Sequence, residues 1–188
     1  MRPGAERPLP RSRGRDLAVR AWRALRPDAE GDADRAWVRS LLRPPEYAIW
    51  SRQSAYDRRH SIRVARRVAT RLAGTPHEGD ARWLAAALMH DVGKAVAGLS
   101  PLSRAAAAVA NRVVDLETAR RWARSGRGRL GRIGLYLIHG EVGARLIRDA
   151  GGREEVAAWS EAHQAERVER VPGFPPAVVA ALTGSDVA

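Results

Sequence analysis

The chain has 188 residues and no cysteine, which suits a single domain and excludes disulfides, thiolate nucleophiles and cysteine-based zinc sites. No apolar run approaches the roughly 18 residues of a membrane span, and the basic N-terminus lacks the apolar segment of a secretory signal. A cytoplasmic enzyme or binding protein with no membrane partner is therefore expected.

The formal net charge of +12 comes from two regions of the chain. Residues 1–72 hold 18 arginines against 8 acidic residues, and residues 104–132 hold 8 arginines against 2. Such basic regions attract nucleic acids and small anionic substrates alike. The second region has Trp122 as its single aromatic residue, so it offers no row of rings on which bases could stack.

Helical spacing of apolar residues dominates the chain after a first stretch that has none. Residues 1–15 mix Pro, Gly and Arg without periodicity, which is typical of a disordered arm. Helices are predicted over residues 16–25, 32–42, 57–73, 81–91, 101–125, 136–150, 153–164 and 176–187. A Gly-rich loop is expected over 125–131. No segment alternates as a strand does, so the pattern predicts an all-α, globular helical bundle.

The central feature is the stretch 85–94, AAALMHDVGK, in which an apolar helix ends in His90 and Asp91. Burying an unpaired polar group costs about 2–7 kcal/mol, so these two side chains need partners. A hydrogen-bonded core pair is one solution, and a divalent cation bound by imidazole and carboxylate is the other. Gly93 is expected to stop the helix. Lys94 is the single lysine beside 32 arginines, which suggests a specific role for its compact ammonium group.

Four more histidines and aspartates lie on or at the ends of other predicted helices, namely His60, His139, His163 and Asp186. Most share a helix face with apolar residues, as His60 does with Tyr56 and Val64, so their side chains are expected to point inward. One inward histidine is usually satisfied by hydrogen bonds within a core. Four inward histidines together with two aspartates are hard to satisfy without a metal ion.

These residues carry a resemblance to a known family. His60, the His90-Asp91 pair and Asp186, in that order on an all-helical chain with HDVGK at its centre, resemble the HD superfamily of metal-dependent phosphohydrolases. The stretches IHGEVGARLIRDAG, AAWSEAHQ and VVAALTGSDVA resemble its later helices. The resemblance implies an HD-type domain over residues 56–188, preceded by an N-terminal helical extension over 16–55.

The resemblance also implies roles for individual residues. A first metal ion would be held by His60, His90, Asp91 and Asp186. His139 and His163 match the extra histidines of members with a second ion, which Asp91 would bridge. Lys94 matches a lysine near the substrate phosphate. Where many members read His-His-Glu, this chain reads Ala162-His163-Gln164, so one acid of that site is missing.

The expected function is hydrolysis of a phosphate ester or anhydride of a nucleotide or related small molecule. One or two divalent ions would activate water by lowering its pKa from about 15.7 to about 7. Asp91 is the expected bridge and Lys94 the phosphate-binding cation. His139 or His163, when it binds no metal, is the expected general acid. The donor set leaves Mn, Fe, Ni, Co, Zn and Mg open.

Two other functions stay open at this point. The first is a non-catalytic HD-type signalling or scaffold domain with a structural metal site. The second is a nucleic-acid-binding protein that uses the basic N-terminal third, with polyanion affinity that falls steeply with salt. The oligomeric state has no signature in the sequence.

Overall fold

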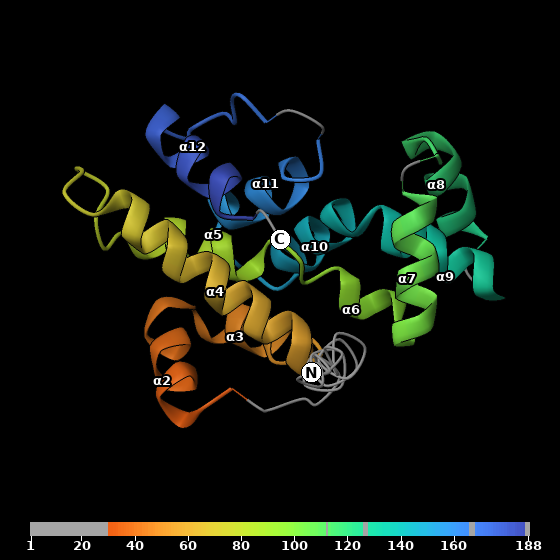
Figure 1. Ribbon diagram of the computed structural model, residues 1–188, viewed down its shortest axis with the longest axis horizontal. Helices are drawn as coiled ribbons and strands as arrows, with labels where there is room; N and C mark the ends of the chain where they lie inside the picture. The colour runs from red at the N-terminus through yellow and green to blue at the C-terminus, as the bar shows by residue number, and fades with distance from the viewer. Residues whose placement is uncertain (1–29, 112, 126–127, 166–167, 187–188) are drawn as a thin grey trace, which may run out of the picture.

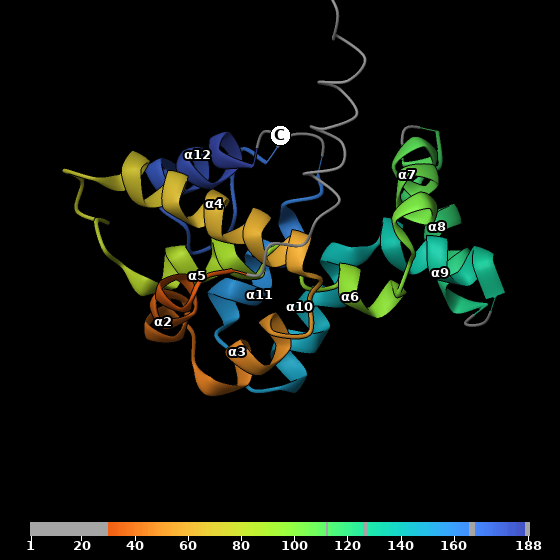
Figure 2. The same cartoon turned by 60° about the horizontal axis from the view of Figure 1, so that its bottom comes forward.

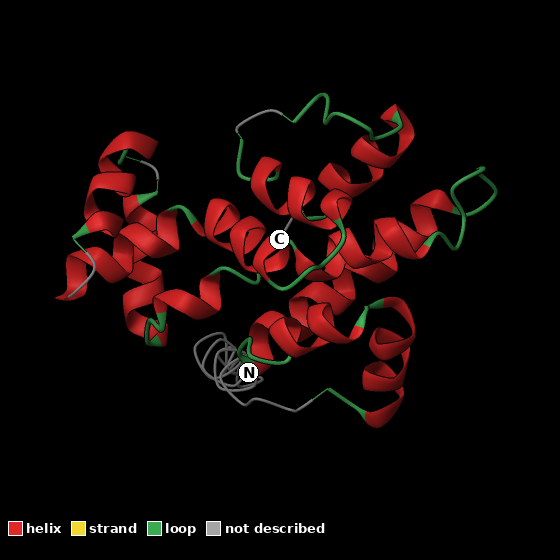
Figure 3. Ribbon diagram, turned by 180° about the vertical axis from the view of Figure 1, so that it is seen from behind, coloured by secondary structure: helices red, strands yellow, loops and turns green. Residues whose placement is uncertain are grey.

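The computed structural model describes residues 30–111, 113–125, 128–165 and 168–186. Within these ranges the protein is helical and contains no strand, which confirms the all-α prediction (Figure 3). The expected arm over 1–15 and the predicted helix over 16–25 lie outside the described residues. The helices are α2 (Asp32–Leu41), α3 (Pro44–Trp50), α4 (Ala55–Leu72), α5 (Ala81–Met89), α6 (Lys94–Ala97), α7 (Pro101–Ala110), α8 (Leu116–Arg124), α9 (Gly128–Leu137), α10 (His139–Asp149), α11 (Glu154–Ala162) and α12 (Pro176–Ser185).

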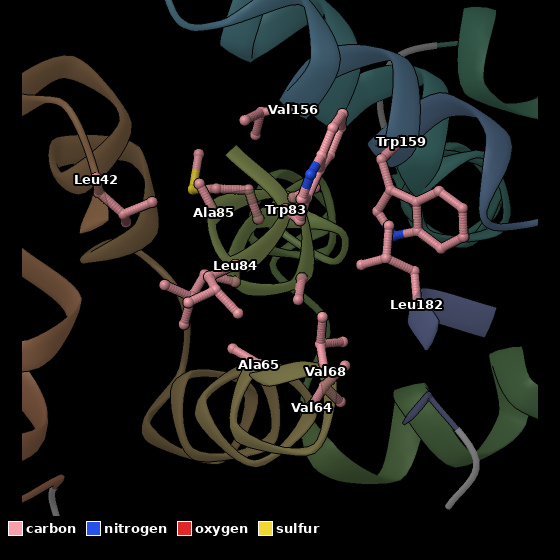
Figure 4. Close-up of a cluster of buried hydrophobic side chains, with 14 of the residues drawn as sticks. Leu42, Val64, Ala65, Val68, Trp83, Leu84, Ala85, Val156, Trp159 and Leu182 are labelled. Carbon is pink, nitrogen blue, oxygen red and sulfur yellow. The ribbon is translucent and has the colours of Figure 1, made fainter. Parts of the chain in front are cut away.

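Helix α5 lies at the centre of the molecule and is buried from Trp83 to Met89. Its N-cap is Asp80, whose side chain accepts a hydrogen bond from the backbone N–H of Arg82 at 2.9 Å. Helices α2, α3, α4, α11 and α12 all contact α5 (Figure 4). Each fully buried side chain the size of Leu88 contributes about 1.5–3 kcal/mol. The polar residues that follow α5 therefore start from a rigid, well-packed position.

Helix α4 packs its apolar face on α5 and its neighbouring face on α12. Val64, Ala65 and Val68 form the face toward α5, as the close-up shows (Figure 4). The Arg71 guanidinium donates to the carbonyl oxygen of Gly184 at 3.0 Å. This contact holds the end of α12, and with it Asp186, against α4.

Helix α3 is tied to the start of α11 by a buried ion pair between Glu46 and Arg153. Glu46 is fully buried and accepts hydrogen bonds from the Arg153 side chain at 2.6 and 3.0 Å and from its backbone N–H at 2.9 Å. The backbone N–H of Arg43 donates to the same carboxylate at 2.8 Å. The helices that precede α4 are thus joined to the core through charge as well as apolar packing.

Helices α7, α8 and α9 form a lobe to one side of the core (Figures 1 and 2). The lobe has a small apolar cluster of its own, formed by Ala119, Leu137 and Ile138. It meets the core through α6 and α10, which pack on α9. Helix α6 links α5 to this lobe and was not predicted from the sequence.

The sequence prediction was wrong in the lobe. The single helix expected over 101–125 is divided into α7 and α8, because the Asp115 side chain caps α8 by accepting from the Thr118 N–H at 2.9 Å. The loop expected over 125–131 is largely the start of α9. Gly128 keeps a positive φ of 92°, as a turn would, but the residues after it continue as helix. Further along α9, a Cβ on Gly134 would lie 2.4 Å from the backbone nitrogen of Ala123, so glycine at that position permits close packing on α8.

Two helix boundaries also differ from the prediction. The helix expected over 136–150 breaks at Ile138 (φ −106°, ψ 27°), so that α10 begins at His139. The helix expected over 81–91 ends at Met89, and the next residues form a turn. Both breaks fall beside histidines of the candidate site, which they orient toward the centre.

Candidate metal centre

The structure brings together all the side chains that the sequence singled out as metal ligands. They come from α4, from the ends of α5, α11 and α12, and from the first residue of α10. Their ligand atoms form two groups, each within 4.8 Å, made of His60, His90 and Asp186 and of Asp91, His139 and His163. Tyr56, expected to share the inward face of α4 with His60, is instead 56% exposed because it lies in the first turn of α4, outside the core.

In the first group two imidazoles face one carboxylate. The Nε2 atoms of His60 and His90 lie 3.1 and 3.3 Å from Oδ1 of Asp186. The same His90 nitrogen is 3.3 Å from Oδ2 of Asp91, and the His60 nitrogen is 4.0 Å from it. Oδ2 of Asp91 therefore belongs to the edge of this group.

In the second group the other oxygen of Asp91 takes part. Its Oδ1 lies 3.0 Å from Nε2 of His139 and 3.6 Å from Nε2 of His163. The two imidazole nitrogens are 3.3 Å apart. One carboxylate thus faces both groups, with one oxygen toward each.

Three of the histidines are held in the same way by the backbone. Nδ1 of His90, His139 and His163 lies 2.7–2.8 Å from the carbonyl oxygen three residues earlier in the chain. A carbonyl accepts hydrogen bonds only, so Nδ1 carries the proton and Nε2 has a free lone pair in the neutral ring. Histidines that bind metal ions are commonly oriented by this kind of contact.

The buried Nε2 of His90 tests whether a cation fits this site. It has no hydrogen-bond partner, although two carboxylate oxygens lie 3.3 Å away. Buried polar groups rarely stay unpaired, so this nitrogen needs either a proton shared with the two carboxylates or a bound cation. Imidazole and carboxylate are ligands for divalent ions, so the donors present fit a metal ion.

A comparison with protein families bears on these observations. The chain matches the family model of the HD domain over residues 58–181, which is more than half of its length. The chain belongs to the HD domain family. HD domains are generally metal-dependent phosphohydrolases. No curated protein and no solved structure compared with the chain matches it. None of the described helices is long and apolar enough to cross a membrane.

The two buried carboxylates of the HD site favour a positive charge between them. Burial lowers the pKa of His90, but the carboxylates of Asp91 and Asp186 outweigh it and raise that pKa to about 10. Burial raises the pKa of Asp91, but His90 and Lys94 more than offset this and hold it well below its usual range. His139 differs, because burial lowers its pKa to about 4 against the opposing effect of Asp91.

Lys94 lies beside the two groups of candidate ligand atoms. Its Nζ donates to Oδ2 of Asp91 at 2.6 Å and lies 5.9 Å from the centre of the Tyr136 ring. The Tyr136 ring in turn lies 5.9 Å from the ring of His139. The lysine is therefore a cation in direct contact with the carboxylate that both groups share.

Gly93 and Gly143 allow the turn after α5, which carries His90 and Asp91, to lie directly against α10. Gly93 was expected to stop α5, but its φ of −63° is open to any residue. A Cβ at this position would lie 2.0 Å from the carbonyl oxygen of His139 and 2.7 Å from the backbone nitrogen of Gly143. The need for glycine comes from this close approach of two backbones.

Gln164 is a residue of the site whose role the sequence did not reveal. Its Oε1 accepts from the backbone N–H of Gly140 at 2.6 Å, and its Nε2 donates to the carbonyl of Leu137 at 3.0 Å. Nε2 also lies 2.9 Å from Nδ1 of His139. The Gln164 amide thus holds α9 and α10 together at the break between them. The sequence feature that could have indicated this role is Gln at a position where the resemblance led us to expect Glu.

A cavity of about 200 Å³ opens beside the two groups of candidate ligands. One ligand from each group, His163 and Asp186, forms part of its wall. Its other lining residues are mostly apolar, namely Trp159, Ala165, Val168 and Thr183. Trp159 is itself buried and belongs to the apolar core.

Proposed function

We propose that the protein is a phosphohydrolase that acts on a phosphate ester or anhydride of a nucleotide or related small molecule. The observation that carries this proposal is the position of Asp91, with one carboxylate oxygen toward each group of imidazole Nε2 atoms. A shared carboxylate is suited to two cations held close together, which is the arrangement that stabilises phosphoryl transfer.

The donor atoms divide between two ions in this proposal. The first would be held by His60, His90, Asp91 and Asp186, and the second by His139, His163 and Asp91. When bound, divalent ions lower the pKa of water toward 7 and neutralise phosphate charge. Nitrogen and oxygen donors of this kind suit Mn, Fe, Ni, Co, Zn and, less well, Mg.

The chain's own side chains supply the remaining roles. Lys94, whose side chain is 21% exposed, would bind a phosphate oxygen next to Asp91. His139 was also considered as a general acid. Its pKa of about 4 favours the ligand role, because a neutral ring with its proton on Nδ1 has none to give at Nε2. The cavity beside His163, which has both polar and apolar lining residues, would receive the part of the substrate that carries no phosphate.

The first test is elemental analysis of protein purified without chelator, in wild type and in Asp91→Ala. We expect near-stoichiometric transition metal in the wild type, a ratio above one where both groups are filled, and loss of metal in the variant. Asp149→Ala removes an exposed carboxylate at the end of α10 and should keep the metal.

A screen of phosphate monoesters, diesters and anhydrides completes the test. Turnover that requires added metal and disappears in Asp91→Ala supports the proposal. Metal binding without turnover of any phosphate compound would favour a scaffold role. A wild-type protein that takes up no metal, even on reconstitution, would contradict the proposal.

A further inference from the structure

Arg104 is an arginine of the lobe that reaches back to the core of the HD domain. It is the fourth residue of α7, and its Nη1 donates to Oδ2 of Asp57 on α4 at 2.7 Å. Its Nε donates to the carbonyl of Leu99 at 3.3 Å. This pair connects two segments that are 47 residues apart.

Asp57 brings Arg104 to the edge of the metal centre. It lies one helical turn before His60 on α4, so the two side chains project from neighbouring positions. Asp57 is buried, and the Ser54 hydroxyl donates to its carboxylate at 2.6 Å. A buried carboxylate with these two donors fixes the position of the Arg104 guanidinium.

Lys94 lies on the same side of the site. It is the first residue of α6, and its Nζ donates to Oδ2 of Asp91 at 2.6 Å. Asp57, which is bonded to Arg104, lies in the first turn of α4. The start of α4 and helix α6 lie next to each other on the side facing the lobe (Figure 1).

The two cations are equally accessible, since the side chains of Lys94 and Arg104 are each 21% exposed. The contacts of Arg104 with the described residues use Nε and Nη1. Its guanidinium therefore keeps Nη2 for a ligand, and a planar fork of this kind is suited to phosphate oxygens. A phosphate that enters next to Lys94 would have a second fixed positive charge beside it.

We propose that Arg104 and Lys94 form an anion subsite for a second phosphate group, so that the enzyme prefers phosphoanhydrides to substrates with one phosphate. The scissile phosphate would lie at the metal centre, and the neighbouring phosphate would extend toward the lobe. This inference rests on the proposed phosphohydrolase function and narrows its substrate class.

The test measures binding of two probes that cannot be hydrolysed, methylenediphosphonate and methylphosphonate, by calorimetry on Mn²⁺-loaded protein. Wild type, Arg104→Gln and Arg104→Lys are compared with Arg121→Gln, which removes an exposed arginine from the same lobe. The double variant Asp57→Asn with Arg104→Gln avoids leaving a buried carboxylate unpaired. Metal content after each titration shows whether the diphosphonate has removed Mn²⁺.

The wild type should bind the diphosphonate more tightly than the monophosphonate. A lost charge-assisted hydrogen bond should reduce diphosphonate affinity about tenfold or more in Arg104→Gln and in the double variant. Monophosphonate affinity should change by less than about twofold, since the subsite lies beyond the first phosphate. Arg104→Lys should recover part of the loss because it restores the charge, and Arg121→Gln should match the wild type.

An equal loss for both probes, or no loss for either, would overturn the proposal. With no loss for either probe, Arg104 would serve only to hold the lobe, and an equal loss for both would mean that it acts on the first phosphate or on the site as a whole. Because the probes require no turnover, this result is independent of the activity screen. An enzyme that fails to hydrolyse any phosphate while showing the expected selectivity would refute the function and keep the anion subsite.

Discussion

The amide of Gln164 connects two elements that must meet at a fixed angle for His139 to face Asp91. Its oxygen accepts from the N–H of Gly140, the second residue of α10, and its nitrogen donates to the carbonyl of Leu137, the last residue of α9. The first N–H groups of a helix have no partner within the helix, so this contact satisfies a group that burial would otherwise penalise. A side chain that binds no metal itself can thus tune the site.

Replacing Gln164 with Ala should weaken the second metal site. Loss of contacts that orient ligands typically costs about 10–100-fold in metal affinity. We expect Gln164→Ala to show this loss in a Mn²⁺ titration, with the first site retained. Gln164→Glu keeps an acceptor for Gly140 and should bind more tightly than the Ala variant. A Gln164→Ala protein with wild-type affinity at both sites would contradict this role.

The meeting of the histidines and aspartates could be predicted, because each occupies an inward helical position or a helix end. The sequence could not predict which oxygen of Asp91 faces which imidazole, since this depends on helix crossings between distant segments. The pairing of Arg104 with Asp57 could not be predicted from the sequence either. Nothing in an Arg-rich stretch distinguishes the one arginine that pairs with a carboxylate 47 residues away.

At the scale of helices, the sequence predicted the helices correctly where the apolar face is deeply buried. The prediction failed in the lobe, where a glycine can indicate either a turn or a close contact between helices. Helices α4 and α5 follow their apolar periodicity and their caps at Ser54 and Asp80. In the lobe, Gly128 keeps the positive φ of a turn at the start of α9, whereas Gly134 permits close contact between α8 and α9. Turn propensity is a property of the glycine alone. Whether a Cβ would fit at that position depends on a second helix that the local sequence does not indicate.

Gly93→Ala should separate α10 from the turn that carries Asp91. The new Cβ would meet backbone atoms of His139 and Gly143, which cannot rotate away as a flexible side chain would. Overpacking of this kind costs about 1–3 kcal/mol, measurable by urea unfolding. The same variant should bind less metal at the second site. Gly31→Ala has open space around its Cβ and should change stability little. Wild-type stability and metal content in Gly93→Ala would show that the backbones can move apart.

The whole molecule extends beyond the matched family range, because α2 and α3 precede residue 58. We propose that residues 16–55 act as an extension of an HD domain that begins near residue 56. The buried pair of Glu46 and Arg153 joins the described part of that extension to α11, the helix that ends beside His163. Stability of the extension and geometry of the site should therefore be linked.

Glu46→Gln should destabilise the whole fold at neutral pH. The change leaves the Arg153 charge buried without its partner, which costs about 3–5 kcal/mol in comparable pairs. Burial raises the pKa of Glu46, but hydrogen bonds from Arg153 outweigh it and lower that pKa below its usual value. A lowered pKa in the folded state means that the ionised form stabilises the protein above the unfolded pKa, about 4.3, and that this stability is lost as pH falls through the folded pKa.

The difference in unfolding free energy between wild type and Glu46→Gln should therefore be large at pH 7 and shrink below about pH 4. Urea unfolding at several pH values measures it. Glu154→Gln removes an exposed partner of Arg148 at the start of the same helix and should cost less than about 1 kcal/mol, with the difference again lost at low pH. A Glu46→Gln penalty as small as this control, or one that grows on acidification, would mean that apolar packing alone holds α3 to the HD domain.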